Sequence, residues 1–463
     1  MDHNPTDLKR EIERKWEILG HERPETLKAE YPSQPSIYRV PEHLRELSNN
    51  AYIPWRVSIG PYHYNNPKFW VMEEHKLEYM KAFINRASHK KLEDYIKVVE
   101  QLEPMARFCY ADRTIGLIQS KDFVEMLLID GCFIVEFLLR KIQKLALVEM
   151  EPTRRSYGQM YEFVGSISPF RPTHDIIFRS TRTSFEVRRD LILLENQLPY
   201  DVLERLYDLT FNKPDEASSS YAHSQESNQL RERIGVSNVA NLVSFLKICC
   251  RPFPTTYPPD VALPVPTEPA CLCSLDGRDT KEFRVPSVTQ LAKAGVHFKA
   301  SKSPWLSIDF ANGVLELPAL SIWHHTDTFF RNVMVYELYT EANHTRTTTI
   351  SDYMCLMDDL INSKEDVALL TKEGIIHNWL ESDDALSDLF NSITKHILAD
   401  HASYARTCKD LNDFLKKPMP KYKAILRQNY FNEPWAIIYF ITGVLIQTAA
   451  TIIQAVTDIR SNK

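Results

Sequence analysis

The stretch RRDLILLENQLPYDVLERLYDL, residues 188–209, indicates the fold class most clearly. Its apolar residues recur at helical spacing, and Pro199 suits the first turn of a helix, where a backbone amide hydrogen is not needed. The stretch therefore predicts one helix that ends near Gln197 and a second helix that begins at Pro199.

Polar residues interrupt this apolar stretch just before the proline: Asp190, Glu195, Asn196 and Gln197. The last carbonyl groups of a helix have no partners within the helix, so a buried helix end must find them elsewhere. The side-chain amides of Asn196 and Gln197 can donate hydrogen bonds to such carbonyls. We therefore interpret these residues, together with Pro199, as structural, and a binding role is the alternative.

Residues 121–147, KDFVEMLLIDGCFIVEFLLRKIQKLAL, also have a strong helical pattern. Large apolar residues recur there at the spacing expected for one face of an amphipathic helix. They are Phe123, Met126, Leu127, Phe133, Ile134, Phe137, Leu138 and Ile142. A long helix with one apolar face is therefore expected.

The C-terminal half stays mainly helical in pattern, with one exception. Residues 289–298 have helical spacing, and Ser363 with Asp366 forms a capping-box pattern at the start of another helix. The exception is Asn312-Gly313, which follows alternating apolar residues and predicts a β-hairpin because both residues tolerate positive φ. The predicted fold is therefore mainly α, a helical domain with one small β-hairpin element.

Composition changes mark the boundaries of the chain's segments, and its length of 463 residues makes two domains a reasonable expectation. Residues about 212–282 are rich in Pro and Ser, which is typical of irregular structure. We interpret them as an insert within one α-rich domain. The predicted segments are a polar lead-in at 1–36, the α-rich domain at 37–415, a basic segment at 416–434, a terminal span at 435–456 and a short tail at 457–463.

The terminal segment 435–456 contains no Asp, Glu, Lys, Arg or His, although charged residues make up 25% of the chain. As a helix its 22 residues would measure ~33 Å, enough to cross a hydrocarbon core of ~30 Å. Trp435 and Tyr439 lie at its leading end, as in the aromatic belt of a membrane interface. We predict a C-terminal transmembrane helix in contact with membrane lipid. A terminal helix buried in a protein core is the alternative, and the segment's Gln and Thr residues favour it.

Basic residues are more frequent before the terminal segment than after it. Arg460 and Lys463 follow it, whereas Lys416, Lys417, Lys421, Lys423 and Arg427 precede it. This excess predicts that the bulk of the chain faces the cytosol, on the plasma membrane or an endomembrane. The same residues can attract anionic lipid.

One stripe of the terminal segment is small or polar, and it consists of Gly443, Gln447, Ala450 and Gln454. In lipid such a stripe favours association between helices, which suggests a homo-oligomer formed through this segment. The alternative is that the two Gln side chains are merely tolerated or turn toward protein.

Composition and missing motifs argue against several classes of protein. A net charge of −6 gives no overall field to hold nucleic acid, so no nucleic-acid partner is predicted. The chain has 12 glycines and contains neither G-x-G-x-x-G nor G-x-x-x-x-G-K-[ST], so we expect no nucleotide cofactor. The eight cysteines form no C-x-x-C pair, and no cofactor or metal ion is predicted. The charged N-terminus lacks the apolar run of a signal peptide.

No catalytic motif was recognised, so no catalytic residue is predicted. In VSIGPYHY, residues 57–64, Tyr62 and His63 follow Gly60-Pro61, which is typical of a tight turn. An exposed contact patch is the alternative interpretation. Convergence of His63, His75 or Glu195 in a cleft would favour an enzyme with an unrecognised site.

Several stretches occur in the order found in one plant family, and the chain resembles the family catalogued as domain of unknown function 247. The resemblance runs from about Ile37 to the terminal span, and SIGPYH and LLENQLP carry its most specific motifs. Further stretches that match are DGCFIVEFLL, LELPALSIW and FFRNVMVYELY, which contains Tyr336 and Glu337. We interpret these two residues, with Tyr62 and His63, as structural family-motif positions. The chain departs from the common pattern at Tyr64 and Leu338.

The resemblance implies a plant origin, a mostly helical domain with a variable middle and a C-terminal transmembrane helix. Some grass members of the family look like male determinants of self-incompatibility, which favours recognition over catalysis. We therefore expect a single-pass membrane protein that recognises an unknown protein partner in signalling, in a self-incompatibility-like process or in stress and defence. A soluble or membrane-tethered enzyme is the alternative function.

Overall fold

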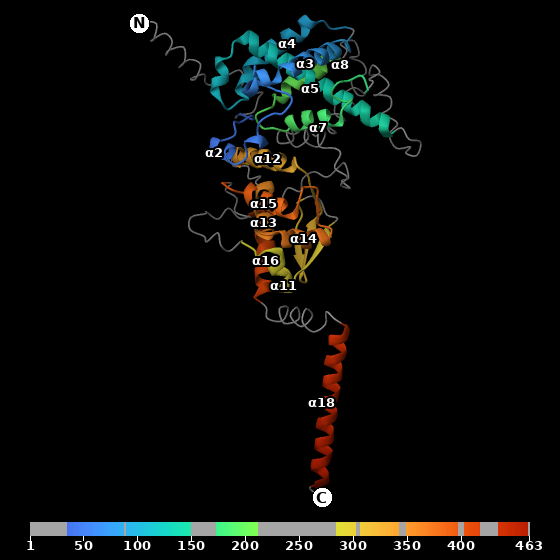
Figure 1. Ribbon diagram of the computed structural model, residues 1–463. Coiled ribbons are helices and arrows are strands. Elements are labelled where there is room, and N and C mark those ends of the chain that lie inside the picture. Colours follow the sequence, from blue (N-terminus) through green and yellow to red (C-terminus); the bar gives the residue numbers. More distant parts are fainter. Residues whose placement is uncertain are drawn as a thin grey trace, which may run out of the picture. The chain divides into compact units, whose positions relative to one another are not determined.

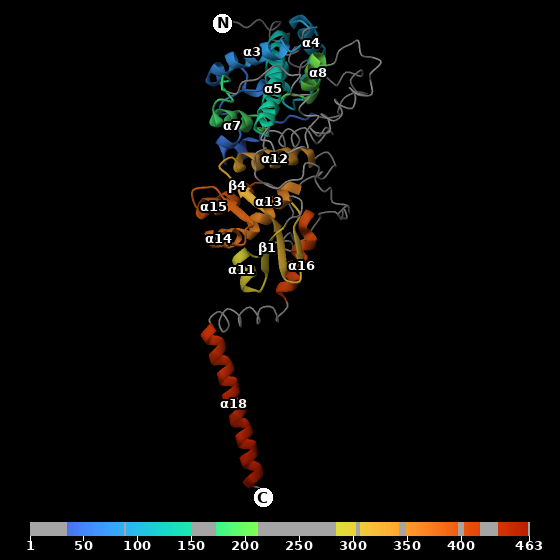
Figure 2. The same cartoon turned by 90° about the vertical axis from the view of Figure 1, so that its right-hand side faces the viewer.

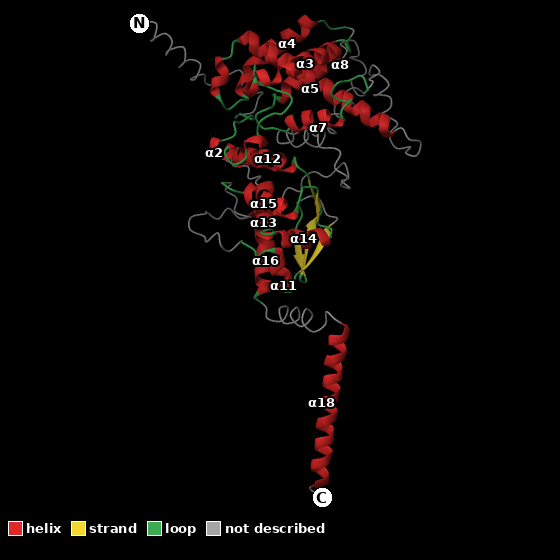
Figure 3. Ribbon diagram, in the orientation of Figure 1, coloured by secondary structure: helices red, strands yellow, loops and turns green. Residues whose placement is uncertain are grey.

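The computed structural model describes residues 35–87, 89–149, 173–211, 284–301, 306–341, 349–396, 402–416 and 434–461. These residues are mainly helical, with a few short strands, as the sequence predicts (Figures 1 and 3). The insert predicted at 212–282 lies outside the described residues, as do most of the lead-in and most of the basic segment. The chain divides into two compact units: Met1–Pro254 with Thr328–Tyr339, and Thr255–Asp327 with Thr340–Lys463.

The first unit is a group of helices packed around the long helix α5. Helices α3, α4 and α8 contact α5, and α4 also contacts α8 (Figure 2). Residues 328–339 of helix α12 belong to the same unit. Its helices are α2 (Glu42–Arg45), α3 (Trp70–Ile84), α4 (Leu92–Phe108), α5 (Ser120–Glu149), α7 (Thr181–Asp190), α8 (Tyr200–Phe211) and α12 (Thr326–Glu341), with short 3₁₀ turns at Asn49–Ala51, Pro61–His63, Pro67–Phe69 and Arg113–Leu117.

Helix α5 confirms the helix predicted at 121–147, but the prediction of a single apolar face was wrong. Apolar side chains are buried around most of the helix, and so are the charged side chains of Asp130 and Glu136. Gly131 permits close packing with α8, because a Cβ atom there would lie 2.5 Å from Leu206 Cδ1. The helix is a central core element, and its buried charges require ion-pair partners.

The helix predicted to end near Gln197 ends at Asp190 instead, whereas α8 begins at Tyr200, directly after Pro199 as predicted. Residues 191–199 form turns. The side-chain amides of Asn196 and Gln197 compete with helical hydrogen bonding here because they bind backbone carbonyls of residues 190, 191 and 193. The Asn-Gln pair therefore satisfies carbonyls at a helix end, but it does so from a turn that follows the helix.

The second unit contains a small sheet and the predicted hairpin. Strands β2 (Asp309–Ala311) and β3 (Val314–Pro318) are antiparallel, and Asn312 and Gly313 join them with φ angles of 53° and 78°. A third strand, β1 (His297–Ser301), pairs with β3 in parallel, which was not predicted. The helix expected over 289–298 is therefore shorter: α11 covers Val288–Lys293, and Gly295, with φ of 96°, separates it from β1.

Helices and one more strand pair complete the described part of the second unit. Ser363 forms the predicted capping box with Asp366 at the start of α14. Strands β4 (Leu320–Ile322) and β5 (Ile376–Asn378) pair in parallel. The helices are α13 (Thr349–Leu360), α14 (Lys364–Lys372), α15 (Asp383–Ile393) and α16 (Ala405–Leu415), with a 3₁₀ turn at Ala402–Tyr404.

The last element is helix α18, Pro434–Ser461, which contains the predicted terminal span (Figure 1). Within the described residues, no helix meets the length and hydropathy that a membrane crossing requires. The described residues therefore do not support the transmembrane helix at 435–456, which stays a prediction.

Candidate functional site

The polar residues singled out in the sequence gather around the extended segment 53–60, IPWRVSIG, in the first unit. Among the described residues no strand pairs with this segment. Its buried backbone groups must still find hydrogen-bond partners, because an unsatisfied buried amide costs ~1–3 kcal/mol. Side chains from the end of α7, from the turn that follows it and from α5 supply many of these partners, and we call this arrangement the backbone clamp.

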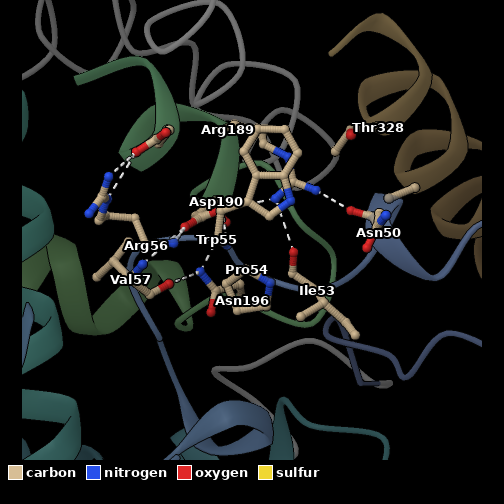
Figure 4. A network of polar contacts seen from close by, with 12 residues as sticks. Asn50, Ile53, Pro54, Trp55, Arg56, Val57, Arg189, Asp190, Asn196 and Thr328 are labelled. Carbon is tan, nitrogen blue, oxygen red and sulfur yellow. Dashed lines mark hydrogen bonds and ion pairs between the residues drawn. The ribbon is translucent and has the colours of Figure 1, made fainter. Parts of the chain in front are cut away.

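Asp190 is the centre of the backbone clamp (Figure 4). Its carboxylate accepts hydrogen bonds from the backbone amides of Trp55, Arg56 and Val57 at 2.8, 2.5 and 2.9 Å. The side chain is completely buried. Burial raises the pKa of Asp190 above its ordinary value, and the three amide hydrogen bonds and Arg189 oppose that rise. The carboxylate is fully engaged in holding the segment.

Arg189 balances the charge of Asp190 and binds the same segment (Figure 4). Its Nη1 atom donates to Asp190 Oδ1 at 2.9 Å and to the carbonyl oxygen of Ile53 at 3.0 Å. Its Nη2 atom donates to the carbonyl oxygen of Asn50. The guanidinium carbon lies 3.9 Å from the centre of the Trp55 ring, a cation–π contact. A buried charge is thus neutralised and hydrogen-bonded on several sides.

Asn196, in the turn after α7, binds the same segment through both ends of its side-chain amide. Its Oδ1 atom accepts from the amide of Ile59 at 2.7 Å, and its Nδ2 atom donates to the carbonyls of Val57 and Asp190 at 3.0 and 2.9 Å. One amide side chain therefore links three positions of the backbone. Neither a shorter nor a charged side chain provides this combination of donors and acceptor.

Gly60 ends the segment in a conformation that requires glycine. Its φ and ψ angles are 71° and −174°, and a Cβ atom there would lie 2.5 Å from the carbonyl oxygen of Gln197. The Gly60 amide donates to Asp130 Oδ2 at 2.8 Å. Lys76 Nζ lies 2.6 Å from Asp130 Oδ1, so this buried carboxylate has a buried cation as its partner.

Glu195 connects the turn to residues near the start of the described chain. Its Oε1 atom accepts from the amide of Val40 at 2.7 Å and from Arg45 Nη2 at 2.6 Å. His63 Nε2 lies 3.8 Å from Glu195 Oε2, which is too long for a hydrogen bond. Burial and, to a smaller extent, the positive charges of Arg45, Arg39 and Lys68 lower the pKa of His63 to about 4. His63 is therefore neutral at physiological pH.

Tyrosine side chains pack beside this turn. Tyr110 donates its hydroxyl hydrogen to the carbonyl oxygen of Gln197 at 3.0 Å. Tyr62 contacts Tyr110 edge to face, with ring centres 5.7 Å apart. Burial raises the pKa of both tyrosines above the ordinary value, so neither is a ready proton donor at neutral pH.

Helix α12 joins the backbone clamp through Asn332, which the sequence analysis missed. Asn332 Oδ1 accepts from the amide of Leu194 at 2.8 Å, and Nδ2 donates to the carbonyl of Ala51 at 2.8 Å. Tyr336 is half-buried on the same helix, and Glu337 is buried there. The structure places these two residues on a core helix.

The structure brings together six of the nine family-motif residues predicted from the sequence, whereas Pro199 precedes α8 and Tyr336 and Glu337 lie on α12. Tyr62, His63, Asp190, Glu195, Asn196 and Gln197 meet around segment 53–60. The sequence analysis missed Arg189, Asp130, Lys76 and Asn332. A signal for Asp130 was available, because a carboxylate in the middle of an apolar helix requires a buried partner.

The described part of the chain offers few reactive groups. In the described part of the chain, no cluster of His, Cys, Asp or Glu side chains could hold a metal ion. Burial raises the pKa of Cys109, Cys355 and Cys408 to about 12, so these thiols stay protonated and are poor nucleophiles. The contact recorded for His75 is with Glu78 on the same helix, with Nδ1 and Oε2 3.4 Å apart, and not with His63 or Glu195.

Comparison with protein families identifies the chain. The model of the family DUF247, described as plant protein of unknown function, matches residues 37–448, so the chain belongs to this family. The match begins where the resemblance noted in the sequence begins.

Two proteins of Arabidopsis thaliana are similar over most of their length. The UPF0481 protein At3g47200 is 26% identical, and the match covers 92% of this chain and 88% of that protein. The putative UPF0481 protein At3g02645 is 24% identical, with 89% of this chain and 88% of that protein covered. No solved structure matches the chain.

Proposed function

We propose that this plant protein is a membrane-anchored recognition component. Residues 435–456 lie in lipid, and the α-rich body lies on the cytosolic side, where it binds another protein in signalling or in recognition between cells. The observation that carries the proposal is the uncharged run of 22 residues within helix α18. A soluble helix of this length needs a charged face toward water, and this run has none.

The apolar side chains of α18 support a lipid environment. Eight of them are exposed by 46–74%: Ile438, Tyr439, Ile441, Val444, Leu445, Ile446, Ile452 and Ile453. Leaving apolar surface in water costs roughly 25 cal/mol per Å², so a helix with this surface gains much from an apolar medium. A bilayer provides that medium around the whole circumference.

The threonines of α18 are compatible with lipid. The hydroxyl of Thr442 donates to the carbonyl oxygen of Ile438 at 2.6 Å, and that of Thr451 donates to Gln447 at 2.7 Å. Thr448 donates to Val444 in the same way, at 2.8 Å. A hydroxyl bonded within its own helix needs no water, so these side chains add little to the cost of insertion.

The flanking charges supply the orientation. Five basic residues lie between Leu415 and Pro434, and two follow the span. Under the positive-inside rule this asymmetry keeps the preceding side in the cytosol. Gly443, Gln447, Ala450 and Gln454 then form the face through which two anchors associate in lipid.

The backbone clamp supports recognition over catalysis. The carboxylates of Asp190 and Asp130 and the amide of Asn196 are engaged in binding backbone groups or a buried cation. A catalytic group must be able to exchange a proton or bind a substrate, and these groups would first have to release their structural partners. These contacts favour a structural role over a catalytic one for the three side chains.

Fractionation of the full chain, tagged at both termini and expressed in plant cells, tests the anchor. We expect the intact protein to stay in the membrane pellet after alkaline carbonate and a truncation after Asn432 to be soluble. Protease added to sealed vesicles should digest the N-terminal tag and spare the C-terminal tag. As a matched control, an unrelated leucine-rich span in place of 435–456 should restore pelleting. An unchanged distribution of the truncated protein would contradict the anchor.

An enzyme is the second candidate, and one observation favours it: His63 and Glu195 lie 3.8 Å apart. Purified protein should then change the composition of a plant metabolite extract, and His63→Gln should abolish that change. Mass spectrometry of the extract measures this directly. If no metabolite changes in a His63-dependent way, the enzyme candidate is rejected.

A further inference from the structure

Helix α3 carries a group of large apolar side chains on its exposed side. Trp70, Val71 and Leu77 are exposed by 59%, 75% and 46%, and Tyr64, just before the helix, is exposed by 41%. Isolated exposed apolar residues are common on protein surfaces, but contiguous ones mark interaction sites. These four residues, Tyr64, Trp70, Val71 and Leu77, are called the α3 surface below.

Two residues of the α3 surface, Trp70 and Leu77, lie on one stripe of the helix. Trp70, Glu74, Leu77 and Lys81 follow each other at intervals of four and three residues, so they lie along one side of the helix. The opposite side, with Met72, Lys76, Tyr79 and Phe83, is buried, and α3 packs against α5. The fold therefore fixes α3 rigidly and leaves the stripe uncovered by described residues.

Acidic residues surround the α3 surface. Glu73, Glu74 and Glu78 lie on α3 itself, and Glu125 is exposed on the neighbouring helix α5. The charges of Asp122, Glu125 and Glu73 all act on Tyr64, whose hydroxyl pKa is raised mainly by burial and additionally by these carboxylates. Glu73 on α3 and Asp122 and Glu125 at the start of α5 are thus close enough to Tyr64 for their charges to act on it.

The cations nearby do not balance these charges. Lys76 is buried and paired with Asp130 and Glu73, at 2.6 and 2.7 Å. Lys68 is exposed and donates to the carbonyl oxygen of Pro54 at 3.0 Å. Lys81 is exposed at the far end of the stripe. Lys121 is also exposed at the start of α5, so the carboxylates near the α3 surface outnumber the lysines by six to four: Glu73, Glu74, Glu78, Asp122, Glu125 and Asp130 against Lys68, Lys76, Lys81 and Lys121.

We propose that the α3 surface binds a basic amphipathic helix of a partner protein. The apolar face of that helix packs on Trp70, Val71 and Leu77, and its Lys and Arg side chains reach Glu74 and Glu78. Charge supports this partner over an anionic membrane, which the carboxylates repel. The inference rests on the proposed recognition function and names the chemical class of its partner.

A synthetic peptide tests the proposal on the intact, detergent-solubilised protein. The probe is a fluorescent Leu/Lys peptide with helical spacing, about four turns long. We expect saturable binding, measured by anisotropy, that weakens with added salt. A Leu/Glu peptide of the same pattern and a Leu/Lys peptide with scrambled pattern should bind at least about tenfold more weakly.

Substitutions at exposed positions locate the binding site. Trp70→Ala with Leu77→Ala should weaken binding by at least about tenfold, because a truncated tryptophan anchor removes most of the apolar contact. Glu74→Lys with Glu78→Lys should weaken binding of the Leu/Lys peptide and strengthen binding of the Leu/Glu peptide. Trp379→Ala is the matched control: Trp379 is 55% exposed but lies in the second unit. Circular dichroism checks that every variant is folded.

Three outcomes would overturn the proposal. Equal binding of the acidic and basic peptides would exclude charge recognition, and unchanged binding by the Trp70/Leu77 double variant would exclude the α3 surface. If the wild-type chain sediments as an oligomer and the double variant sediments as a monomer, the α3 surface binds a second copy of the chain instead. These readouts are independent of the fractionation test. The peptide can bind even if residues 435–456 do not anchor the chain in a membrane, and the anchor can hold even if the peptide does not bind.

Discussion

Two regions of the molecule satisfy their backbone hydrogen bonds in opposite ways. In the hairpin of β2 and β3, backbone groups bind backbone groups across a short turn at Asn312-Gly313. In the backbone clamp, segment 53–60 is bound by side chains that lie more than 130 positions away along the chain, such as Asp190 and Asn196. The hairpin divides its stability among equivalent backbone hydrogen bonds, whereas the clamp concentrates its stability in a few side chains. Single substitutions should therefore affect the two regions very differently.

Asp190→Ala should have the largest effect. It leaves three backbone amides and the cation of Arg189 without their buried carboxylate partner. Removal of one member of a buried ion pair costs ~3–5 kcal/mol. We expect a loss of this size in the free energy of unfolding, measured by urea denaturation. Asp190→Asn should cost less stability than Asp190→Ala, because the amide side chain keeps one hydrogen-bond acceptor. If Asp190→Ala lost no more stability than an ordinary surface substitution, the role given to Asp190 would be contradicted.

Two glycines with nearly the same φ separate backbone strain from close packing. Gly60 and Gly374 have φ angles of 71° and 70°, but a Cβ atom would meet Gln197 O at 2.5 Å in the first case and no atom within 4 Å in the second. Gly374→Ala should cost about 1 kcal/mol and Gly60→Ala about 2–4 kcal/mol. Thermal unfolding of the two variants measures the difference. Equal losses of stability in the two variants would show that the backbone clamp can accommodate a Cβ atom at position 60, which would contradict the close contact with Gln197.

The acid sensitivity of the clamp should depend on His63. Its pKa is about 4 in the folded protein against an ordinary value of 6.5, so between these pH values the unfolded chain binds a proton that the folded protein excludes. Stability should therefore fall as pH decreases from 6.5 to 4, by up to about 3 kcal/mol for this group. Denaturation curves across this window measure the slope. His63→Gln should flatten it, and an equal slope in the variant would remove His63 as the cause.

The smallest effect is expected from the exposed ion pair of the sheet. Lys299 on β1 and Glu316 on β3 face each other, with Nζ and Oε1 2.6 Å apart and side chains 65% and 37% exposed. Exposed pairs of this kind contribute ~0.2–1 kcal/mol. Lys299→Ala should change the urea midpoint by little more than experimental error, and this small effect should vanish in high salt. A large loss would show that the sheet, like the clamp, depends on single side chains.

Local sequence signals predicted those parts of the fold that local interactions determine. Asn312-Gly313 specified the hairpin, Ser363 with Asp366 specified the start of α14, and Pro199 specified the start of α8. Each signal acts within a few residues, through backbone conformation or a cap. Strand β1 was missed because its pairing with β3 depends on contacts that no local pattern reveals.

The candidate site could be recognised from the sequence only in part. The polar residues of LLENQLP stand out within an apolar stretch, and their place at a helix end suggested a structural role. Their partners could not be inferred, because the backbone amides of Trp55, Arg56 and Val57 are bound regardless of side-chain identity. Arg189 was missed because an arginine beside another arginine normally indicates a solvated surface.

The backbone clamp also differs from the α3 surface, and this second contrast bears on function. A polar cluster in a buried turn is a natural place to look for catalysis, and here its groups are engaged in maintaining the fold. The α3 surface has the opposite character: its side chains contribute little to the core and are exposed. We therefore expect substitutions in the clamp to change protein abundance and substitutions on the α3 surface to change partner binding.

Amide hydrogen exchange of the intact protein tests the central claim most directly. The amides of Trp55, Arg56, Val57, Ile59 and Gly60 lie outside any described strand, yet each donates to a buried side-chain oxygen. We predict protection comparable to that of the β3 amides, and a selective loss at Trp55, Arg56 and Val57 in Asp190→Asn. Exchange of these amides at the rate of an unstructured loop in the wild-type protein would contradict the backbone clamp.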